Sequence, residues 1–312
     1  MVQKSDRTQG ISQTQIISAL ENIYISPLES CNLACKYCYT HKTPDILSNQ
    51  QILDFINKYQ NYLTSENCHL KSIIFCGGEV FTLPDFPKLV NTLIQKGIFI
   101  TIITNGTIDK LDQIDDPANC QLLVSLDGPQ DIHDANRASG NFQKSIKYIK
   151  HAQKLGFPVE IMFLITKDSY PFKDSFNISN LPKTYLTDRK LSLTTKQVLD
   201  IKQHYPTFPA KNFGCFQLSL QSNGNITGCC ESSLSLGKID DDPKIYINNF
   251  TKSLSKCNSC INLRSNIDDL RSNCGGCCDS DYLCGYKKEF NQINCQNVIN
   301  LFVETHCNAS LP

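Results

Sequence analysis

The chain has 312 residues, of which 40% are hydrophobic and 19% are charged, so it can build a core and is not disordered. Lysine plus arginine and aspartate plus glutamate number 30 each, and this zero net charge argues against a protein built to bind nucleic acid or an anionic membrane. No apolar run approaches the ~18 residues that a membrane-spanning helix needs. The start, MVQKSDRTQG, lacks the apolar core of a signal peptide. We therefore expect a cytoplasmic protein that uses neither nucleic acid nor membrane as a partner.

Strand-like and helix-like segments alternate through the first two thirds of the chain. Expected strands cover residues 23–28, 71–76, 98–103, 121–126 and 158–165, with a sixth inside 183–192. One expected helix begins after Ser48 and has an apolar face that runs from Ile52 to Leu63. The other expected helices cover residues 86–96, 142–155 and 194–204. Repeated βα units predict an α/β fold, a partial (β/α)6 barrel with its chemistry at the carboxyl ends of the strands.

Two details qualify this pattern. The helix at 142–155 is expected to bury Phe142, Ile146, Ile149 and Leu155. Residues 166–182 show no clear helix, so that βα unit is expected to be abbreviated.

Cysteine usage changes sharply along the chain. Six of the 17 cysteines lie in residues 1–214 and eleven lie in residues 215–312. An odd number without an export signal disfavours a disulfide framework and favours metal or redox chemistry. The expected domains are an N-terminal extension at 1–22, a barrel at 23–205 and a small cysteine-rich domain at 206–312.

A cysteine triplet follows the first expected strand, with the spacing Cys31-x3-Cys35-x2-Cys38. Three thiolates from one loop can bind three irons of a 4Fe–4S cluster and leave the fourth iron open to a small molecule. Tyr37, directly before the third cysteine, can form a wall for a flat adenine. The alternatives are a zinc site, which usually has four ligands often arranged as pairs, or cysteines that only pack.

Polar motifs follow the next three expected strands. These are Gly77-Gly78-Glu79, then Thr104-Asn105-Gly106-Thr107, then Ser125-Leu126-Asp127-Gly128 with His133-Asp134 and Arg137 further on. Alone, each has an ordinary interpretation as a turn or a solvated helix residue. At the ends of successive parallel strands, however, they are expected to meet at one edge of the sheet.

In this order, over residues 23–165, these motifs and the cysteine triplet resemble the radical S-adenosylmethionine (SAM) superfamily. The SLDG…HD…R run is similar to that of peptide-modifying members. The resemblance implies that Glu79 anchors the SAM amino group, that Arg137 binds its carboxylate, and that the cleaved SAM yields a 5′-deoxyadenosyl radical. The cofactor contacts that it implies are Tyr37, Gly77, Gly78, Glu79, Thr104, Asn105, Ser125, Asp127, Arg137 and Leu164.

The last third resembles the SPASM extension, which carries two auxiliary 4Fe–4S clusters in many radical SAM maturases. The resemblance assigns Cys215, Cys229 and Cys278 to the nearer cluster, and Cys257, Cys260, Cys274 and Cys295 to the farther one. The 13-residue gap from Cys260 to Cys274 is longer than usual, and the spacing from Cys215 to Gly224 is one residue tighter. Cys284 and Cys307 remain alternatives to Cys295 as the last ligand. The nearer cluster has three assigned ligands, so one of its irons can be without a protein ligand. Structural zinc is the competing interpretation of these cysteines.

Two further cysteines are candidate catalytic hydrogen donors. Cys76 immediately precedes Gly77, beside the expected SAM site, although a buried packing cysteine is the alternative. Cys230 follows a predicted cluster ligand. Sulfatase-maturing relatives carry a catalytic aspartate at that position, so its absence weakens a formylglycine-generating function.

The resulting hypothesis is a radical SAM oxidoreductase that modifies a ribosomally made (RiPP) peptide by cross-linking, epimerisation or excision. The alternatives are a small-molecule or sugar dehydrogenase and a non-catalytic electron carrier, which has no use for Glu79 or Arg137. A flavodoxin- or ferredoxin-type donor is expected to supply electrons. Only 30 residues precede Cys31, so a leader peptide is expected to be bound by a separate protein or by the extension.

Overall fold

The computed structural model describes residues 20–38, 40, 42–187, 193–205, 217–228 and 235–251. Six strands form a parallel sheet in which neighbours in the chain are neighbours in space. They are β1 (Asn22–Ile25), β2 (Ser72–Phe75), β3 (Phe99–Thr104), β4 (Cys120–Leu126), β5 (Val159–Ile165) and β6 (Lys183–Thr187). The predicted α/β fold with six parallel strands is therefore confirmed.

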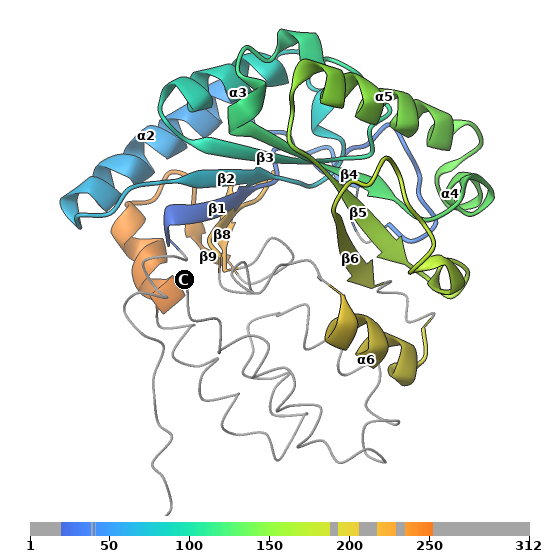
Figure 1. The fold of residues 1–312 in the computed structure, drawn as a ribbon. Helices are drawn as coiled ribbons and strands as arrows, with labels where there is room; N and C mark the ends of the chain where they lie inside the picture. Colours follow the sequence, from blue (N-terminus) through green and yellow to red (C-terminus); the bar gives the residue numbers. More distant parts are fainter. Residues whose placement is uncertain are drawn as a thin grey trace, which may run out of the picture.

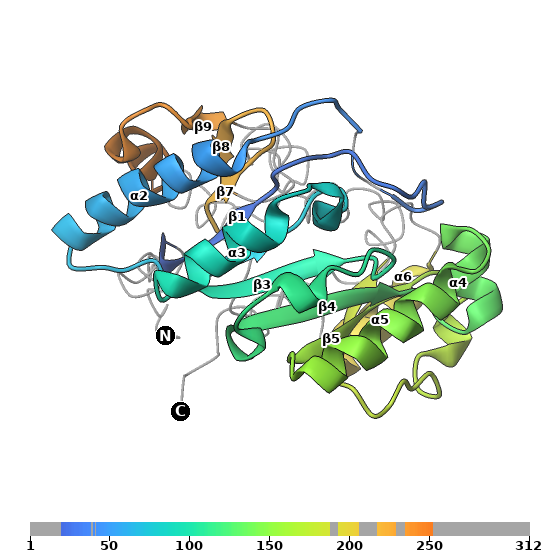
Figure 2. The same ribbon diagram turned by 90° about the horizontal axis from the view of Figure 1, so that it is seen from above.

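Except for the last one, which lies beside β6, the helices cover the convex side of this curved sheet (Figure 1), and Figure 2 shows them from above. The helices are α2 (Asn49–Ser65), α3 (Phe86–Gln95), α4 (Gln130–Arg137), α5 (Asn141–Leu155) and α6 (Thr195–His204). Short 3-10 turns occupy η1 (Val80–Thr82), η2 (Leu111–Gln113), η3 (Pro117–Asn119) and η4 (Tyr170–Phe172). Between β5 and β6 the described chain contains only the short turn η4. This agrees with the expectation that the βα unit at residues 166–182 is abbreviated. None of the helices within the described ranges combines enough length with enough apolar character to span a lipid bilayer.

Local sequence explains where α2 begins. The Ser48 side chain accepts a hydrogen bond from the Gln51 backbone, and the Gln51 side chain returns to the Ser48 backbone, which makes a capping box. The buried side chains of α2 are the predicted ones, Ile52, Phe55, Ile56, Tyr59 and Leu63.

The expected face of α5 is partly wrong. Its fully buried side chains include Ser145, Tyr148 and Ala152 beside the predicted Ile149, whereas Phe142, Ile146 and Leu155 are only half-buried against the core. Tyr148 packs edge-on against Phe81 at a ring-centroid distance of 6.2 Å. Ser145 tolerates burial because its hydroxyl donates to the Asn105 carbonyl at 2.7 Å.

The sheet continues beyond residue 206. β7 (Ser219–Leu220) pairs in parallel with β1, and β8 (Asn225–Thr227) and β9 (Ser235–Lys238) follow antiparallel, giving nine strands. In the helix at 243–251, the Tyr246 ring lies 6.3 Å from Phe55 and 6.4 Å from Tyr59. These parts of the segment predicted as a separate domain thus share the core under α2, and the boundary at 205/206 stays a prediction.

Candidate active site at the carboxyl ends of the strands

The cysteine loop, residues 31–38, follows β1. Cys31, Cys35 and Cys38 are all half-buried free thiols. Burial raises the pKa of Cys31 and Cys35, and Lys42 and Arg137 respectively act against this rise. The charge of Cys38 also raises the pKa of Cys31, and the charges of Cys31 and Cys38 raise the pKa of Cys35.

The cysteine loop suits an iron–sulfur cluster better than a single metal ion. In the described part of the chain, no three histidine, cysteine or acidic side chains converge on one ion position. A 4Fe–4S cluster binds each thiolate through a different iron, so its ligands surround one cluster and do not need to meet at a single ion. The Leu33 backbone N–H and the Asn105 side-chain amide donate to Cys31 Sγ at 3.4 and 3.8 Å, the kind of donors that tune such clusters. The residues present therefore fit this group.

A glycine pair fastens the chain after β2 to the segment that leads into the cysteine loop. The Gly78 N–H donates to the Leu28 carbonyl at 2.9 Å, and the Glu79 N–H donates to the Ser30 carbonyl at 3.1 Å. A Cβ on Gly78 would lie 1.8 Å from the Ser30 carbonyl oxygen and would overlap with it. Gly77 has φ +102°, and a Cβ there would lie 2.4 Å from the Leu28 oxygen. Both positions therefore require glycine because two backbones pass in contact.

The Glu79 carboxylate lies at the ends of β2 and β3 and is 1% exposed. It accepts the Thr104 hydroxyl at 2.9 Å, the Asn105 N–H at 2.8 Å and the Phe81 N–H at 3.3 Å. Burial raises the pKa of Glu79, and these donors oppose the rise. Three predicted residues, Glu79, Thr104 and Asn105, are thus brought together, and Asn105 connects them to Cys31.

A second polar group lies at the end of β4. Arg137 Nε donates to Asp127 Oδ2 at 2.8 Å, with exposures of 12% and 0% for the two side chains. Asn136 donates its amide to the same oxygen. Burial acts to lower the pKa of Arg137, but the charge and hydrogen bond of Asp127 outweigh it, so the net shift is upward. His133 Nδ1 accepts the Asp127 N–H at 3.3 Å.

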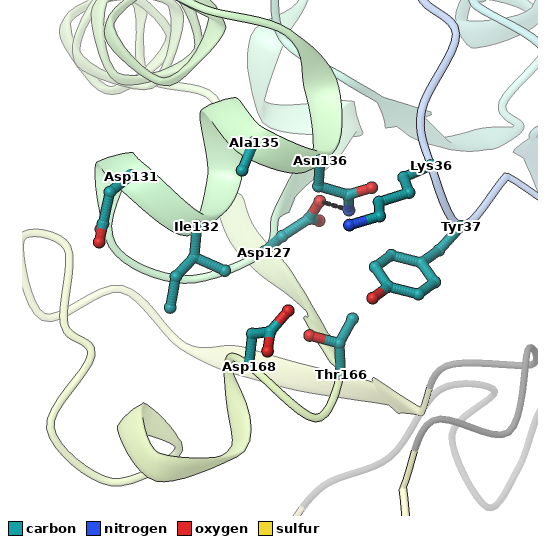
Figure 3. Close-up of a pocket in the computed structure, with 9 residues that line it drawn as sticks. All are labelled: Lys36, Tyr37, Asp127, Asp131, Ile132, Ala135, Asn136, Thr166 and Asp168. Carbon is teal, nitrogen blue, oxygen red and sulfur yellow. Dashed lines mark hydrogen bonds between the residues drawn. The ribbon is translucent and has the colours of Figure 1, made fainter.

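A cavity of about 250 Å³ opens between the cysteine loop, α4 and the segment after β5 (Figure 3). The cysteine loop contributes Lys36 and Tyr37, and the segment after β5 contributes Thr166 and Asp168. The remaining lining residues are Asp127, Asp131, Ile132, Ala135 and Asn136. Tyr37 thus lines this cavity, and its contact with adenine stays a prediction.

Other predicted residues lie on the concave face of the sheet. Cys76 is 6% exposed and forms a small cluster with Tyr24 and Ile74, opposite the helix-covered core. Ser125 and Leu164 occupy the same face by strand alternation but do not line the cavity. The predicted residues Cys215, Cys229, Cys230, Cys257, Cys260, Cys274, Cys278 and Cys295 lie outside the described residues.

Sequence reasoning missed three residues that hold this site together. Asn32 accepts from the Asn105 amide at 2.9 Å and donates to Thr107 at 2.8 Å. Lys36 donates its backbone N–H to the Asn136 carbonyl at 3.0 Å. The available signal was position alone: Asn32 and Lys36 lie between the triplet cysteines, and Asn136 directly precedes Arg137.

Residues 25–173 match the sequence family described as the Radical SAM superfamily. The AdoMet-dependent heme synthase of Oleidesulfovibrio alaskensis is 30% identical over 159 residues, 48% of this chain and 39% of that protein. The antilisterial bacteriocin subtilosin biosynthesis protein AlbA of Bacillus subtilis is 25% identical over 154 residues, 46% of this chain and 33% of that protein. The chain therefore spans less than half the length of these two curated relatives.

The solved structure of native anSMEcpe with bound AdoMet and Cp18Cys peptide has a TM-score of 0.62 and 20% identity, covering 90% of this chain and 98% of that one. At this identity the likeness shows a shared fold. Residues 25–173 thus resemble a radical SAM domain, and the matched family implies a 4Fe–4S cluster and SAM as cofactors.

Backbone strain follows Arg137. Ala138 ends α4 with φ +76° and ψ 149°, a region that is costly for any residue with a Cβ. We expect Ala138→Gly to raise the free energy of unfolding by about 1 kcal/mol, because relief of strain exceeds the added flexibility of the unfolded chain. Denaturant titration measures the change. Ala135→Gly in the same helix is the control and should lower stability by about 1 kcal/mol; equal effects at both positions would contradict the assigned strain.

The buried His133 predicts a pH dependence of stability. Burial is the main cause that lowers its pKa from 6.5 to about 4, and the nearby charges of Asp127, Arg137 and Asp134 act in both directions. The folded protein therefore prefers neutral His133. The contribution of neutral His133 to the free energy of unfolding is complete above pH 6.5 and is lost as the pH falls from 6.5 through about 4. The whole contribution is about 3 kcal/mol.

Unfolding of wild type and His133→Gln at pH 7.5, 6.5 and 5.5 measures the effect. We expect a shallower decline of stability with acid in His133→Gln. His69→Gln, which removes an exposed imidazole, is the matched control. Parallel profiles for wild type and His133→Gln would rule out this role.

Proposed function

We propose that this protein is a radical SAM enzyme that abstracts a hydrogen atom from a ribosomally made peptide and thereby installs a modification. The hydrogen-bonded series from Cys31 through Asn105 to Glu79 carries the proposal. It joins the cysteine loop to a buried carboxylate at the ends of neighbouring strands, within the residues that match the radical SAM superfamily.

When bound, the cluster and SAM would supply the radical chemistry that removes a hydrogen atom from the substrate. The chain's residues bind and orient. Cys31, Cys35 and Cys38 hold the cluster, Glu79 accepts the SAM ammonium, and Arg137 binds its carboxylate. The Glu79 carboxylate already accepts hydrogen bonds from Thr104, Asn105 and Phe81. The ammonium therefore has to replace some of these donors when it binds.

The proposal includes the remaining cofactor contacts and the auxiliary clusters. Gly77, Gly78, Thr104, Asn105, Ser125 and Leu164 complete the proposed SAM site, with Tyr37 beside the adenine. The two cysteine sets after residue 206 bind two further 4Fe–4S clusters. Cys76 or Cys230 gives a hydrogen atom to the substrate radical if the product is an epimer. The thiyl radical that remains takes an electron from a flavodoxin- or ferredoxin-type protein, which also supplies the cluster, and a proton from solvent.

Two findings support a peptide substrate. The relative AlbA takes part in bacteriocin biosynthesis, and the anSMEcpe structure contains a bound peptide. A leader-binding partner belongs to the same proposal. Haem synthesis is the second candidate, since the relative from Oleidesulfovibrio alaskensis is a heme synthase.

Reduced, anaerobically reconstituted protein tests both candidates. Peptides from neighbouring short reading frames, deuterated at candidate carbons, and a deuterated iron porphyrin are offered separately with SAM. Deuterium in 5′-deoxyadenosine from a peptide supports the proposal, whereas transfer only from the porphyrin selects the second candidate. Glu79→Gln should keep its iron and lose SAM affinity. A wild-type protein that binds zinc in place of iron and cleaves no SAM contradicts both.

A further inference from the structure

The last turn of α4 lies against the cysteine loop. The Lys36 N–H donates to the Asn136 carbonyl at 3.0 Å, so the residue after Cys35 is fastened to the residue before Arg137. Arg137 is the next residue, so its side chain starts one position from this contact with the cysteine loop.

Asp127 lies at the wall of the cavity and holds Arg137. Its carboxylate is fully buried, and one oxygen accepts both Arg137 Nε and the Asn136 amide. The other oxygen is enclosed and has no hydrogen-bond partner among the described residues. In Figure 3 the carboxylate turns toward Asn136, away from Asp168.

We propose that Asp127 is a positioning residue that holds the Arg137 guanidinium against the cysteine loop and so raises the reduction potential of the cluster bound there. The inference rests on the proposed function. Reduction adds negative charge to the cluster, and a fixed positive charge beside Cys35 stabilises that state. Asp127 prevents Arg137 from turning out into water.

Two variants that remove the same charge separate this role from a direct charge effect. Asp127→Asn keeps an oxygen that can accept Arg137 Nε, so Arg137 stays in place without its counter-charge. Asp127→Leu has a similar size but no acceptor, so Arg137 is released. If Asp127 acts only through its own charge, both variants raise the cluster potential. If it positions Arg137, Asp127→Asn keeps or raises the potential and Asp127→Leu lowers it.

The experiment uses reconstituted holoprotein and an EPR-monitored redox titration without SAM. The relevant cluster is the one whose signal changes when SAM is then added. We expect Arg137→Gln and Asp127→Leu each to lower its midpoint potential. The double variant that combines these two substitutions should have the same midpoint potential as Asp127→Leu. SAM affinity should fall about 10-fold to 100-fold in both single variants, as for loss of one hydrogen bond to a charged group, and stay near wild type in Asp127→Asn.

The exposed Asp54→Asn on α2 is the charge control and should leave the potential unchanged. If Asp127→Leu does not load iron, Asp127→Ser, which is too short to reach Arg137, replaces it. Shifts of equal sign in Asp127→Asn and the variant without an acceptor overturn this inference alone. A wild-type protein without any SAM-responsive cluster overturns the proposed function as well.

Discussion

Replacing Cys31, Cys35 and Cys38 together with alanine is expected to remove about four irons per chain and to abolish 5′-deoxyadenosine release. The auxiliary cysteine sets would keep the rest of about twelve irons, since they lie after residue 206. Iron analysis and chromatography of the reduced protein with SAM measure both quantities. Cys68→Ala removes a buried thiol beyond α2 and is the control for cysteine loss. Unchanged iron in the triple variant would disprove the assigned cluster loop.

Gly78→Ala is expected to cost about 4 kcal/mol or more of stability, or to prevent folding around the site. The added Cβ would lie 1.8 Å from the Ser30 oxygen and 2.9 Å from the Glu29 carbonyl carbon, and neither backbone atom can move independently. Displacing residues 29–30 also displaces the cysteine loop, so iron loading should fall with stability.

Gly97→Ala provides the matched control. Gly97 has φ +78°, but nothing lies within 4 Å of its added Cβ. Its cost is therefore conformational only, about 1–2 kcal/mol. Denaturant unfolding and iron content compare the two variants. Similar losses in both would show that the close approach at Ser30 is not decisive.

The elements that the sequence predicts well are those with a local cause. The capping residues Ser48 and Thr194 begin α2 and α6, and the apolar spacing of α2 fixes its buried face. The face of α5 was partly missed because Ser145 and Ala152 carry little apolar signal; their burial follows from contacts to distant strands. The pairing of β7 with β1 was missed because a two-residue strand has no measurable period.

The site divides in the same way. Spacing at the strand ends predicts which residues gather, and Glu79, Thr104 and Asn105 do meet. The arrangement within the group could not be predicted. The pairing of Asp127 with Arg137 depends on the angle at which α4 leaves β4, and the need for Gly78 depends on how closely residues 29–30 pass. Both are properties of the assembled backbone.

The pairing of β1 has a consequence for synthesis on the ribosome. β1 meets β2 about 50 residues later in the chain, but its other neighbour, β7, is made only at Leu220. At about 5–20 residues per second, roughly 7–30 s pass between completion of β2 and of β7. During that time an apolar edge strand is open to pairing with other nascent chains. A fragment that ends at residue 205 never closes this edge, so we expect it to aggregate when it is expressed alone.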